Sequence, residues 1–454
     1  MIVDSGNAGC KNYREPNHTR RIWGMILIGL LWTGAAFGAS KYDYVDIDNP
    51  LLKKVPIAIP LFKPVTGNAS ESETAQTGAD MLSDMLAFTS YFKILDRGSF
   101  LVDAQKADVA MPMFNGWTTV GAELLVTGAV SLNNNQLEME LRLFDTYNEK
   151  QLLGRKYTGN AKDLRTMIRR FCNEIMGLLT GSSGLFDSQI VFISSGSVGK
   201  EVYVCDFDGS GPTQITHNKN INLSPAMSYD GKWVAYTSYA RGKPDLFIQN
   251  ISDNRISVVD KKGMGISPSW VPGKFELAAS LSFSGDPEIY LLTGTGKVIN
   301  RLTDSPGIDL SPSFSPDGSK MAFVSRRGGT PQIYIQNMNS GQAERLTFQG
   351  NNNTQPEWSP KGDKIVYTAL PKAGNFNICL IGVDGKGLTQ LTTNAQGDNE
   401  SPSWSPDGSM IVFSSTREGT SRIYVMTAYG ADQRRLLSMP GQQTEPKWSP
   451  GMKN

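Results

Sequence analysis

Residue types that could carry out catalysis are scarce in this sequence. Its 454 residues include two histidines, His18 and His217. A single histidine beside a predicted strand end is far more often a surface or turn residue than a ligand, and one histidine cannot form a histidine-rich metal site. The Gly-x-Ser-x-Gly motif of the hydrolase nucleophile elbow does not occur. The sequence therefore predicts no catalytic residue.

The segment "CDFDGSG" (Cys205–Gly211) has a pattern that could bind a metal ion. Asp206, Asp208 and Ser210 place oxygen atoms at alternate positions, as a calcium loop does. The glutamate expected at position twelve of such a loop is missing, and Asp-Gly pairs recur at other predicted strand junctions. A hairpin turn is therefore favoured over a calcium site, and no metal is predicted.

Three carboxylates lie just before predicted strands: Asp309, Glu400 and Glu445. They could form an acidic rim, a weak cation site in a channel, or a set of solvated loop residues. The last interpretation is the default, because charged residues on loops are usually solvated. No glycine-rich phosphate loop accompanies them, so we predict no cofactor.

The overall composition indicates which elements must position these residues. The chain is 39% hydrophobic and 19% charged, with 46 Gly and 24 Pro. So much Gly and Pro points to many turns, and hence to β structure. The 44 basic and 43 acidic residues nearly balance. Because no basic excess exists to neutralise a phosphate backbone, we expect no nucleic-acid partner.

The N-terminal residues 1–38 are predicted to be an export signal. Two arginines precede an uncharged run, 22–39, that ends in small residues. Ala36 and Gly38 have the spacing that a signal peptidase needs, which favours cleavage and a periplasmic location. A retained membrane anchor is the alternative, since the run is long enough to span a bilayer. Twin-arginine export is disfavoured, because the hydrophobic pair expected after the arginines is absent.

The cysteines do not indicate a disulfide framework. Cleavage after residue 38 removes Cys10 and leaves Cys172, Cys205 and Cys379. These three are odd in number, far apart, and surrounded by apolar residues. We expect them to be buried as small hydrophobic side chains.

Residues 39–185 are predicted to form a mixed α/β domain. Apolar runs or strict alternation indicate strands at 55–62, 123–130 and 136–145. Apolar residues at three- and four-residue spacing indicate helices over most of 72–95 and over 157–181. The glycine-rich segment 181–184 is interpreted as a linker, because no lysine or strand–helix context accompanies it.

Residues 186–454 contain an internal repeat. Each copy has a proline before an apolar or aromatic residue, at intervals of 43 to 46 residues, and these are Pro225, Pro268, Pro312, Pro356, Pro402 and Pro446. A turn follows, usually Asp-Gly, and then three further predicted strands that end near "RLT" or "QLT". Asp-Gly supplies the positive φ angles of a tight hairpin. Four antiparallel strands in each repeat are the signature of β-propeller blades.

The two ends of the repeat array complement each other. The segment 189–218 carries a second, third and fourth strand, whereas "EPKWSPGMKN" at the C-terminus carries a first strand alone. Paired, they would make a sixth blade that closes the ring and leaves no exposed strand edge. We therefore predict a six-bladed propeller closed by a split blade.

The loops before the first strands should gather around one mouth of a central channel. They are polar and varied, as in "SPGIDLS" and "AQGDNES". A rigid scaffold that presents six different loops suits a protein partner. The asparagines 351–353 could instead be an adaptable turn.

The repeat "SPxWSPDGxxIxFxS…IYxx…LT" after an exported α/β domain, ending at "KWSP", resembles the TolB family of periplasmic propeller proteins of the Tol–Pal system. The resemblance covers nearly all of the mature chain. Two repeats depart from the pattern: "SPAMSYDG" lacks the aromatic residue and the second proline, and "SPSWVPGKFELAAS" lacks Asp-Gly. We expect those two blades to be less regular.

The resemblance implies a function that the residue chemistry did not show. It implies a non-enzymatic scaffold, associated with the envelope through its partners, that supports outer-membrane integrity and cell division. The lipoprotein Pal would bind the propeller mouth, around Met264, Ser267, Asp309, Leu310, Thr354, Gln355, Glu400 and Glu445. A propeller hydrolase or lyase acting on an envelope polymer is the alternative, disfavoured by the scarcity of histidine and of nucleophiles.

The resemblance also implies a second partner at the mature N-terminus. The inner-membrane protein TolA would bind the segment Ser40–Pro50, whose β-prone residues are Tyr42, Tyr44, Val45 and Ile47. This segment could add as a strand to a partner or fold back on the protein. It could equally be the first edge strand of the α/β domain.

Overall fold

The structure is a computed structural model of the chain. It describes residues 54–101, 108–196, 198–259, 263–283 and 285–450. The predicted signal peptide and the N-terminal segment with Tyr42, Tyr44, Val45 and Ile47 lie outside these residues. Across the described ranges, no helix combines the length and the hydropathy that crossing a bilayer requires.

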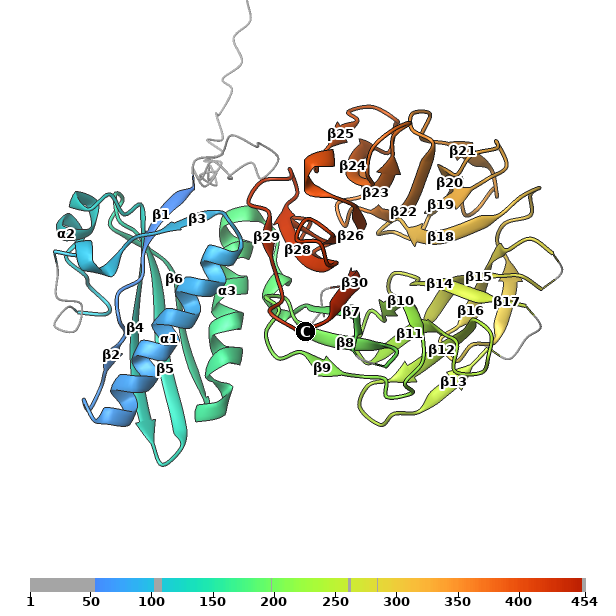
Figure 1. The fold of residues 1–454 in the computed structure, drawn as a ribbon. Coiled ribbons are helices and arrows are strands. Elements are labelled where there is room, and N and C mark those ends of the chain that lie inside the picture. The colour runs from blue at the N-terminus through green and yellow to red at the C-terminus, as the bar shows by residue number, and fades with distance from the viewer. Residues whose placement is uncertain (1–53, 102–107, 197, 260–262, 284, 451–454) are drawn as a thin grey trace, which may run out of the picture. The chain divides into compact units, whose positions relative to one another are not determined.

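The N-terminal part of the described chain is a mixed sheet with helices on one face (Figure 1). The strand order is β3-β1-β4-β5-β6, and the short β2 also pairs with β4. β1 runs parallel to β3 and β4, whereas β4, β5 and β6 are antiparallel. The elements are β1 (Val55–Ala58), β2 (Lys63–Pro64), α1 (Ala69–Phe88), β3 (Phe92–Ile94), α2 (Phe114–Thr119), β4 (Leu124–Asn133), β5 (Gln136–Asp145), β6 (Lys150–Asn160) and α3 (Leu164–Thr180).

The alternation seen in the sequence of β5 explains how this sheet binds its helices. Leu137, Met139, Leu141 and Leu143 are fully buried and share one core with residues of α1 and α3. The side chains between them are polar and face the opposite side of the sheet. Burial of each such leucine or methionine contributes about 1.5–3 kcal/mol.

The first predicted helix is present over most of 72–95. α1 ends at Phe88, because Ser90 takes a left-handed conformation (φ 61°) and the chain turns into β3, whereas the second helix begins later than predicted. The segment 157–160, predicted as the start of the second helix, continues β6. α3 begins only at Leu164, and it ends as predicted, at a glycine, Gly181, with φ 73°.

The second half of the chain forms six sheets of four antiparallel strands each, which lie around a common centre (Figure 1). Five sheets are consecutive in sequence: β10–β13, β14–β17, β18–β21, β22–β25 and β26–β29. The sixth joins β30 to β7, β8 and β9. The predicted six-bladed propeller after an α/β domain is therefore present. We call β10, β14, β18, β22, β26 and β30 the first strands.

The strand limits of the propeller are as follows. In the first two consecutive sheets they are β10 (Asn222–Met227), β11 (Trp233–Ser238), β12 (Asp245–Asn250), β13 (Ile256–Val258), β14 (Gly265–Trp270), β15 (Glu276–Leu281), β16 (Glu288–Thr293) and β17 (Val298–Arg301). In the third and fourth they are β18 (Asp309–Phe314), β19 (Lys320–Ser325), β20 (Gln332–Asn337), β21 (Ala343–Arg345), β22 (Asn352–Trp358), β23 (Lys364–Leu370), β24 (Asn377–Gly382) and β25 (Thr389–Gln390). In the last two they are β26 (Asn399–Trp404), β27 (Met410–Ser415), β28 (Arg422–Thr427), β29 (Arg434–Arg435), β30 (Gln442–Trp448), β7 (Gln189–Ser195), β8 (Lys200–Asp206) and β9 (Thr213–Gln214).

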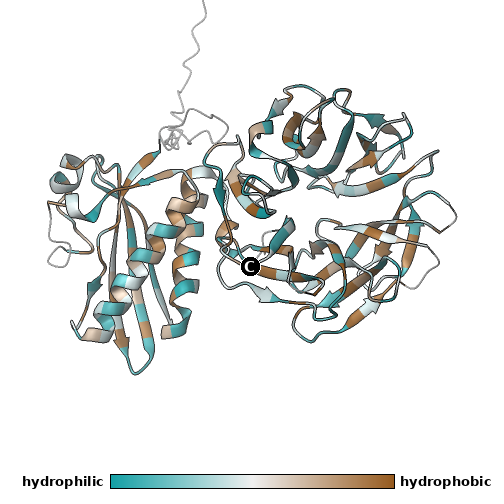
Figure 2. Ribbon diagram, viewed as in Figure 1, coloured by the Kyte–Doolittle hydropathy of each residue, from teal (hydrophilic) through white to brown (hydrophobic). Residues whose placement is uncertain are grey.

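Of the two blades with unusual repeats, β10–β13 is as regular as the others, whereas β14–β17 has an additional register shift between β16 and β17 and is less regular, as expected. β10–β13 and β14–β17 each have four strands, and each first strand has the same register shift as its counterparts. The turn after Trp270 keeps a glycine with positive φ, Gly273, although its Asp is absent. Figure 2 shows that apolar residues lie mainly on the strands, so the blade core does not depend on the turn motif.

The Asp-Gly turns differ from the expected tight hairpin. Strands β18 and β19 are joined by the longer loop 315–319, in which Gly318 alone has positive φ (69°). The carboxylate of Asp317 instead accepts hydrogen bonds from Ser315 Oγ and from the backbone N–H and Oγ of Ser319. These bonds lower the pKa of Asp317 to about 2.

Candidate functional site at the propeller channel

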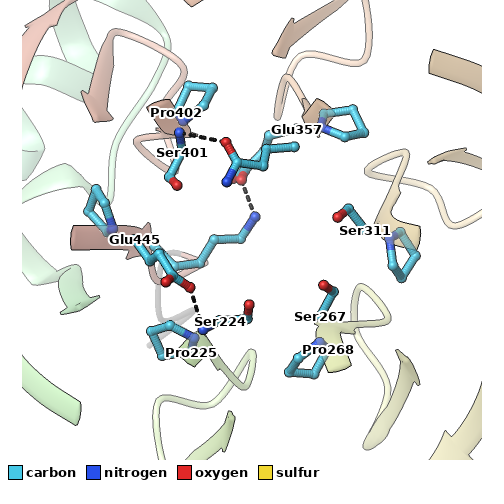
Figure 3. Close-up of a pocket in the computed structure, with 14 residues that line it drawn as sticks. Ser224, Pro225, Ser267, Pro268, Ser311, Glu357, Ser401, Pro402 and Glu445 are labelled. Carbon is cyan, nitrogen blue, oxygen red and sulfur yellow. Dashed lines mark hydrogen bonds and ion pairs between the residues drawn. The ribbon is translucent and has the colours of Figure 1, made fainter. Parts of the chain in front are cut away.

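A ring of six residues, one from each first strand, narrows the propeller channel. They are Ser224, Ser267, Ser311, Gln355, Ser401 and Glu445, each followed by a proline. All six have φ between 50 and 54°, and at each the first strand shifts register against the second. Together with Glu357, Lys447 and the prolines they line a cavity of about 100 Å³, which we call the waist (Figure 3).

Such a conformation is costly for residues other than glycine, at about 1–3 kcal/mol each. The residue before a proline also avoids the right-handed helical region. The left-handed turn therefore lifts one peptide unit out of the sheet at the same point in every blade. This placement brings residues from six distant parts of the chain to one ring.

Two members of the ring already bind the backbone of the next blade. The N–H of Ser224 donates to Glu445 Oε2 at 2.5 Å. The N–H of Ser401 donates to Gln355 Oε1 at 2.9 Å, and that oxygen also accepts from Thr368 Oγ at 2.8 Å. The waist N–H groups are therefore donors that a carboxylate or a carboxamide can satisfy.

An ion pair crosses the waist. Lys447 Nζ of β30 contacts Glu357 Oε2 of β22, past the intervening first strand β26. Glu357 Oε1 also accepts a hydrogen bond from Ser403 Oγ of β26 at 2.9 Å. Only 12% of the Glu357 side chain and 30% of the Lys447 side chain are exposed, so the pair is only partly screened by water.

Asp309 is not the solvated loop residue that the sequence suggested. Its side chain is fully buried, and Oδ2 accepts from Arg327 Nη2 at 2.8 Å and from Ser305 Oγ at 3.2 Å. The Arg327 guanidinium lies over the rings of Phe323 and Tyr334. Burial of the carboxylate is possible because this arginine, 18 residues further on, compensates its charge.

Glu400 and Glu445 are partly buried, and the carboxylate of Glu445 raises the pKa of Glu400. Burial raises the pKa of Glu400, and the nearby carboxylates of Asp398 and Glu445 raise it further. Burial also raises the pKa of Glu445, against the hydrogen bond from Ser224, which lowers it. Of the three predicted carboxylates, Glu400 and Glu445 therefore lie close together and both have a raised pKa, whereas Asp309 is paired with Arg327.

The other predicted mouth residues have mixed positions. Met264 is 41% exposed in the loop before β14, whereas Leu310 and Thr354 are half-buried within first strands. Ser267 and Gln355 belong to the waist ring. Sequence reasoning missed five further waist residues, namely Ser224, Ser311, Ser401, Glu357 and Lys447. The sequence could have identified the ring, because its members are the residues directly before the repeated prolines.

The threonine of the "RLT" and "QLT" motifs makes a buried polar contact near the mouth. Thr303 Oγ donates to Glu288 Oε2 at 2.6 Å and accepts from the N–H of Ile289 at 2.9 Å. The same contact recurs in other blades, between Thr216 and Glu201, Thr347 and Gln332, and Thr392 and Asn377. These contacts join the fourth strand region of a blade to its third strand and stiffen the mouth.

The channel is wider beyond the ends of the first strands. A cavity of about 780 Å³ there is lined by one aromatic side chain from each blade. These are Tyr229, Trp270, Phe314, Trp358, Trp404 and Trp448. The five that end first strands are at most 8% exposed, because they pack between blades.

The segment that resembled a calcium loop binds an arginine. Arg165 Nη2 of α3 donates to Asp206 Oδ2 at 3.1 Å, Asp208 Oδ2 at 2.9 Å and Ser210 Oγ at 2.7 Å. The guanidinium thus takes the place that a cation would have. Within the described ranges, no cluster of three or more potential metal ligands is found.

The remaining candidate residues are one histidine and three cysteines. His217 lies exposed at the surface, in the loop before β10. Cys172, Cys205 and Cys379 are buried and unbridged, as predicted, and burial raises the pKa of each thiol.

Comparison with known proteins supports this architecture. A family model described as the TolB beta propeller domain matches residues 176–452, and one described as the TolB amino-terminal domain matches residues 43–152. The chain is 57% identical over 431 residues to the Tol-Pal system protein TolB of Desulfosudis oleivorans, covering 94% of this chain and 98% of that protein. It is 46% identical over 402 residues to a TolB homolog of Chlorobaculum tepidum, covering 88% and 91%.

A solved structure shows the same arrangement. The crystal structure of TolB from Acinetobacter baumannii superposes with a TM-score of 0.76 at 26% identity, covering 88% of this chain and 97% of that one. The fold and the channel define a six-bladed propeller protein with an N-terminal α/β domain. The chain belongs to the TolB family, as its sequence predicted. Its relatives' names place the family in the Tol-Pal system.

Proposed function

We propose that this protein is a non-enzymatic periplasmic scaffold of the Tol–Pal system, which binds the lipoprotein Pal at the mouth of its propeller. The observation that carries the proposal is the convergence of six different first strands on one stiff opening. Rigid scaffolds with varied rims are suited to recognise proteins. The Tol-Pal names of relatives that align over nearly the whole chain support the identity of the partner.

The ion pairs and hydrogen bonds of the channel carboxylates favour a binding protein over an enzyme. Asp309 is neutralised by Arg327, Glu357 by Lys447, and Glu445 accepts from a backbone N–H. A hydrolase or lyase needs a carboxylate or histidine that is able to exchange a proton with its substrate. Glu357 and Glu445 are engaged in contacts between blades, and Asp309 in a contact within its own blade. Burial raises the pKa of Glu400, so this is the carboxylate that the experiment below tests for turnover.

The proposal extends to the N-terminus and to the cell. The segment Ser40–Pro50 would bind TolA, and the two contacts together would support outer-membrane integrity and cell division. This part depends on family membership, since the segment lies outside the described residues. The same holds for export and for the predicted signal peptide.

Calorimetry with the mature chain and the soluble domain of Pal tests the proposal. Met264 and Leu388 are a matched pair, because each is 41% exposed. Met264 lies in a mouth loop, whereas Leu388 lies between a third and a fourth strand, at the opposite end of the blade. Met264→Asp should weaken Pal binding about tenfold, as expected when an interface side chain is replaced by a charge, and Leu388→Asp should not.

Two outcomes would contradict the proposal. The first is equal binding by both variants, which would place Pal away from the mouth. The second is turnover of a glycan or peptide by the wild type that Glu400→Ala abolishes. Deletion of 40–50 should leave Pal binding intact and remove TolA binding.

A further inference from the structure

The waist ring is chemically asymmetric. Ser267 and Ser311 lie across the channel from Ser401 and Glu445 (Figure 3). The N–H groups of Ser224 and Ser401 each follow a ring member with a long side chain, which accepts from them. Among the described residues, the N–H groups of Ser267, Ser311, Gln355 and Glu445 follow serines, which are too short to reach them. Of these four, Ser267 and Ser311 are the neighbouring pair in which each member also carries a hydroxyl.

The protein itself shows what the waist N–H groups bind. At Ser224 the acceptor is a carboxylate and at Ser401 it is a carboxamide, each supplied by the ring residue of the preceding blade. The backbone of Ser267 and Ser311 has the same conformation, with φ 52° and 54° against 50° and 54°. Their N–H groups therefore hold the same position relative to the waist, and each stands beside a hydroxyl that can also donate.

The mouth loops on this side carry charges of both signs. Arg326 of the Ser311 blade is exposed, and so are Asp286 and Asp304, of which Asp304 pairs with Arg301. The carboxylates of Glu400 and Glu445 lie on the other side, where they repel a further negative group.

We propose that Ser267 and Ser311 form a carboxylate-binding subsite, which takes the side chain of an aspartate or glutamate from the protein that covers the mouth. The carboxylate accepts from the two N–H groups and the two hydroxyls, as Glu445 accepts from Ser224. Charge-assisted hydrogen bonds of this kind contribute more than neutral ones.

The first experiment needs no partner. The full mature chain, labelled with ¹⁵N, is titrated with sodium acetate at neutral pH, with sodium chloride at equal ionic strength as the control. The amide protons of Ser267 and Ser311 should shift downfield and saturate. Those of Ser224 and Ser401 are internal controls and should not respond, because their acceptors are in place. No response at Ser267 and Ser311, or an equal response at all four, would overturn the proposal.

The second experiment introduces a carboxylate of the protein itself into the subsite. Ser267→Glu should place a carboxylate on the Ser311 N–H, as Glu445 does on Ser224. Its backbone suits a long side chain, since Gln355 and Glu445 have φ of 52° and 51°. Pal affinity should fall by about ten- to a hundredfold, the equivalent of one or two charged hydrogen bonds. Ser401→Glu adds the same charge on the opposite side, and it should change the affinity less than about threefold.

The outcomes separate this inference from the proposed function on which its partner rests. If the wild type binds Pal and Ser267→Glu binds it equally well, the subsite is refuted and Pal binding stands. If both glutamate variants weaken binding equally, general repulsion explains the effect and the subsite is again refuted. If the wild type does not bind Pal, the proposed function fails, and the acetate titration alone decides the inference.

Discussion

Lys447 and Glu357 form an ion pair that joins the first strands of two blades across the strand between them. The residues are 90 positions apart in the sequence. Since Glu357 also binds Ser403 of the intervening strand, one carboxylate fixes the spacing of three blades. The shape of the waist therefore depends on contacts between blades as well as on each blade's own fold.

Removing one partner of this pair should destabilise the propeller more than removing both. Lys447→Met leaves the Glu357 carboxylate partly buried without its cation, and we expect a loss of about 1–3 kcal/mol in the free energy of unfolding. The double variant with Glu357→Gln should recover much of that loss. Urea unfolding of the three variants checks this, and additive losses would refute the coupling.

Disrupting an exposed ion pair is the control for that comparison. Lys156 and Glu138 are paired on the surface of the α/β sheet, with 62% and 43% of their side chains exposed. Their substitution should leave the urea midpoint unchanged, because water screens the pair.

Glu71 should be the most sensitive carboxylate of the α/β domain. Its side chain is fully buried and accepts from the N–H and Oγ of Thr66, the N–H of Gly67 and the N–H of Leu132. Burial alone would raise the pKa of Glu71, but these four bonds outweigh it and hold the pKa below its usual value. Glu71→Gln should cost about 2 kcal/mol, because a carboxamide cannot accept all four bonds.

The pH dependence gives this prediction a second readout. A carboxylate whose pKa is lowered by folding stabilises the folded protein at pH values above the pKa of the unfolded chain. This stabilisation is lost as the pH falls through the pKa of the folded protein. The unfolding free energy of the wild type should therefore decline on acidification more steeply than that of Glu71→Gln. Parallel curves would show that Glu71 is not the group that titrates.

Glu400 should have the opposite effect. Its raised pKa means that the folded protein prefers the protonated form, so its contribution to stability is present at low pH and is lost as the pH rises through the folded pKa. Glu400→Gln should therefore be at least as stable as the wild type at neutral pH. A marked loss of stability at neutral pH would mean that the ionised carboxylate has a partner that this account overlooks.

Deleting β30, the first strand that comes last in the sequence, tests whether this strand closes the propeller. Truncation before Gln442 removes β30, including Trp448, which is 3% exposed, and leaves an edge of β7 without its partner. Loss of one such buried tryptophan alone costs about 3–5 kcal/mol. Calorimetry should show a lower and broader transition for this form, whereas deletion of 451–454, which keeps β30 whole, should not. An unchanged transition for both would refute closure through β30.

The repeat architecture could be predicted because its signals are local. A proline shortly before an apolar or aromatic residue recurs in every blade, and a turn glycine in each of the five blades that are consecutive in sequence, so the strand order and the blade number follow from the spacing. The end of α1 could not be predicted, because its apolar pattern continues beyond the point at which Ser90 adopts a left-handed turn.

The chemistry of the waist could be predicted only in part. The residues before the repeated prolines mark the ring, but their acceptors come from other blades: Glu445 and Ser224 are 221 positions apart. The burial of Asp309 depends likewise on Arg327 and its two aromatic neighbours. The arginine contact recurs in the β26–β29 blade, where Arg417 lies over Phe413 and Tyr424 and donates to Asn399 Oδ1. The contact between Glu445 and Ser224 joins different blades and has no such local signal, so the sequence favoured solvated carboxylates where the structure has engaged ones.

Hydrogen exchange with and without Pal tests most directly the claim that the mouth is the partner-binding surface. Pal should slow amide exchange in the segments that lead into the waist, among them 263–267, 308–311 and 398–401. The turns at the opposite end of the blades, 271–275, 315–319 and 405–409, should exchange as before. Protection confined to those turns, or to the α/β domain, would contradict the account.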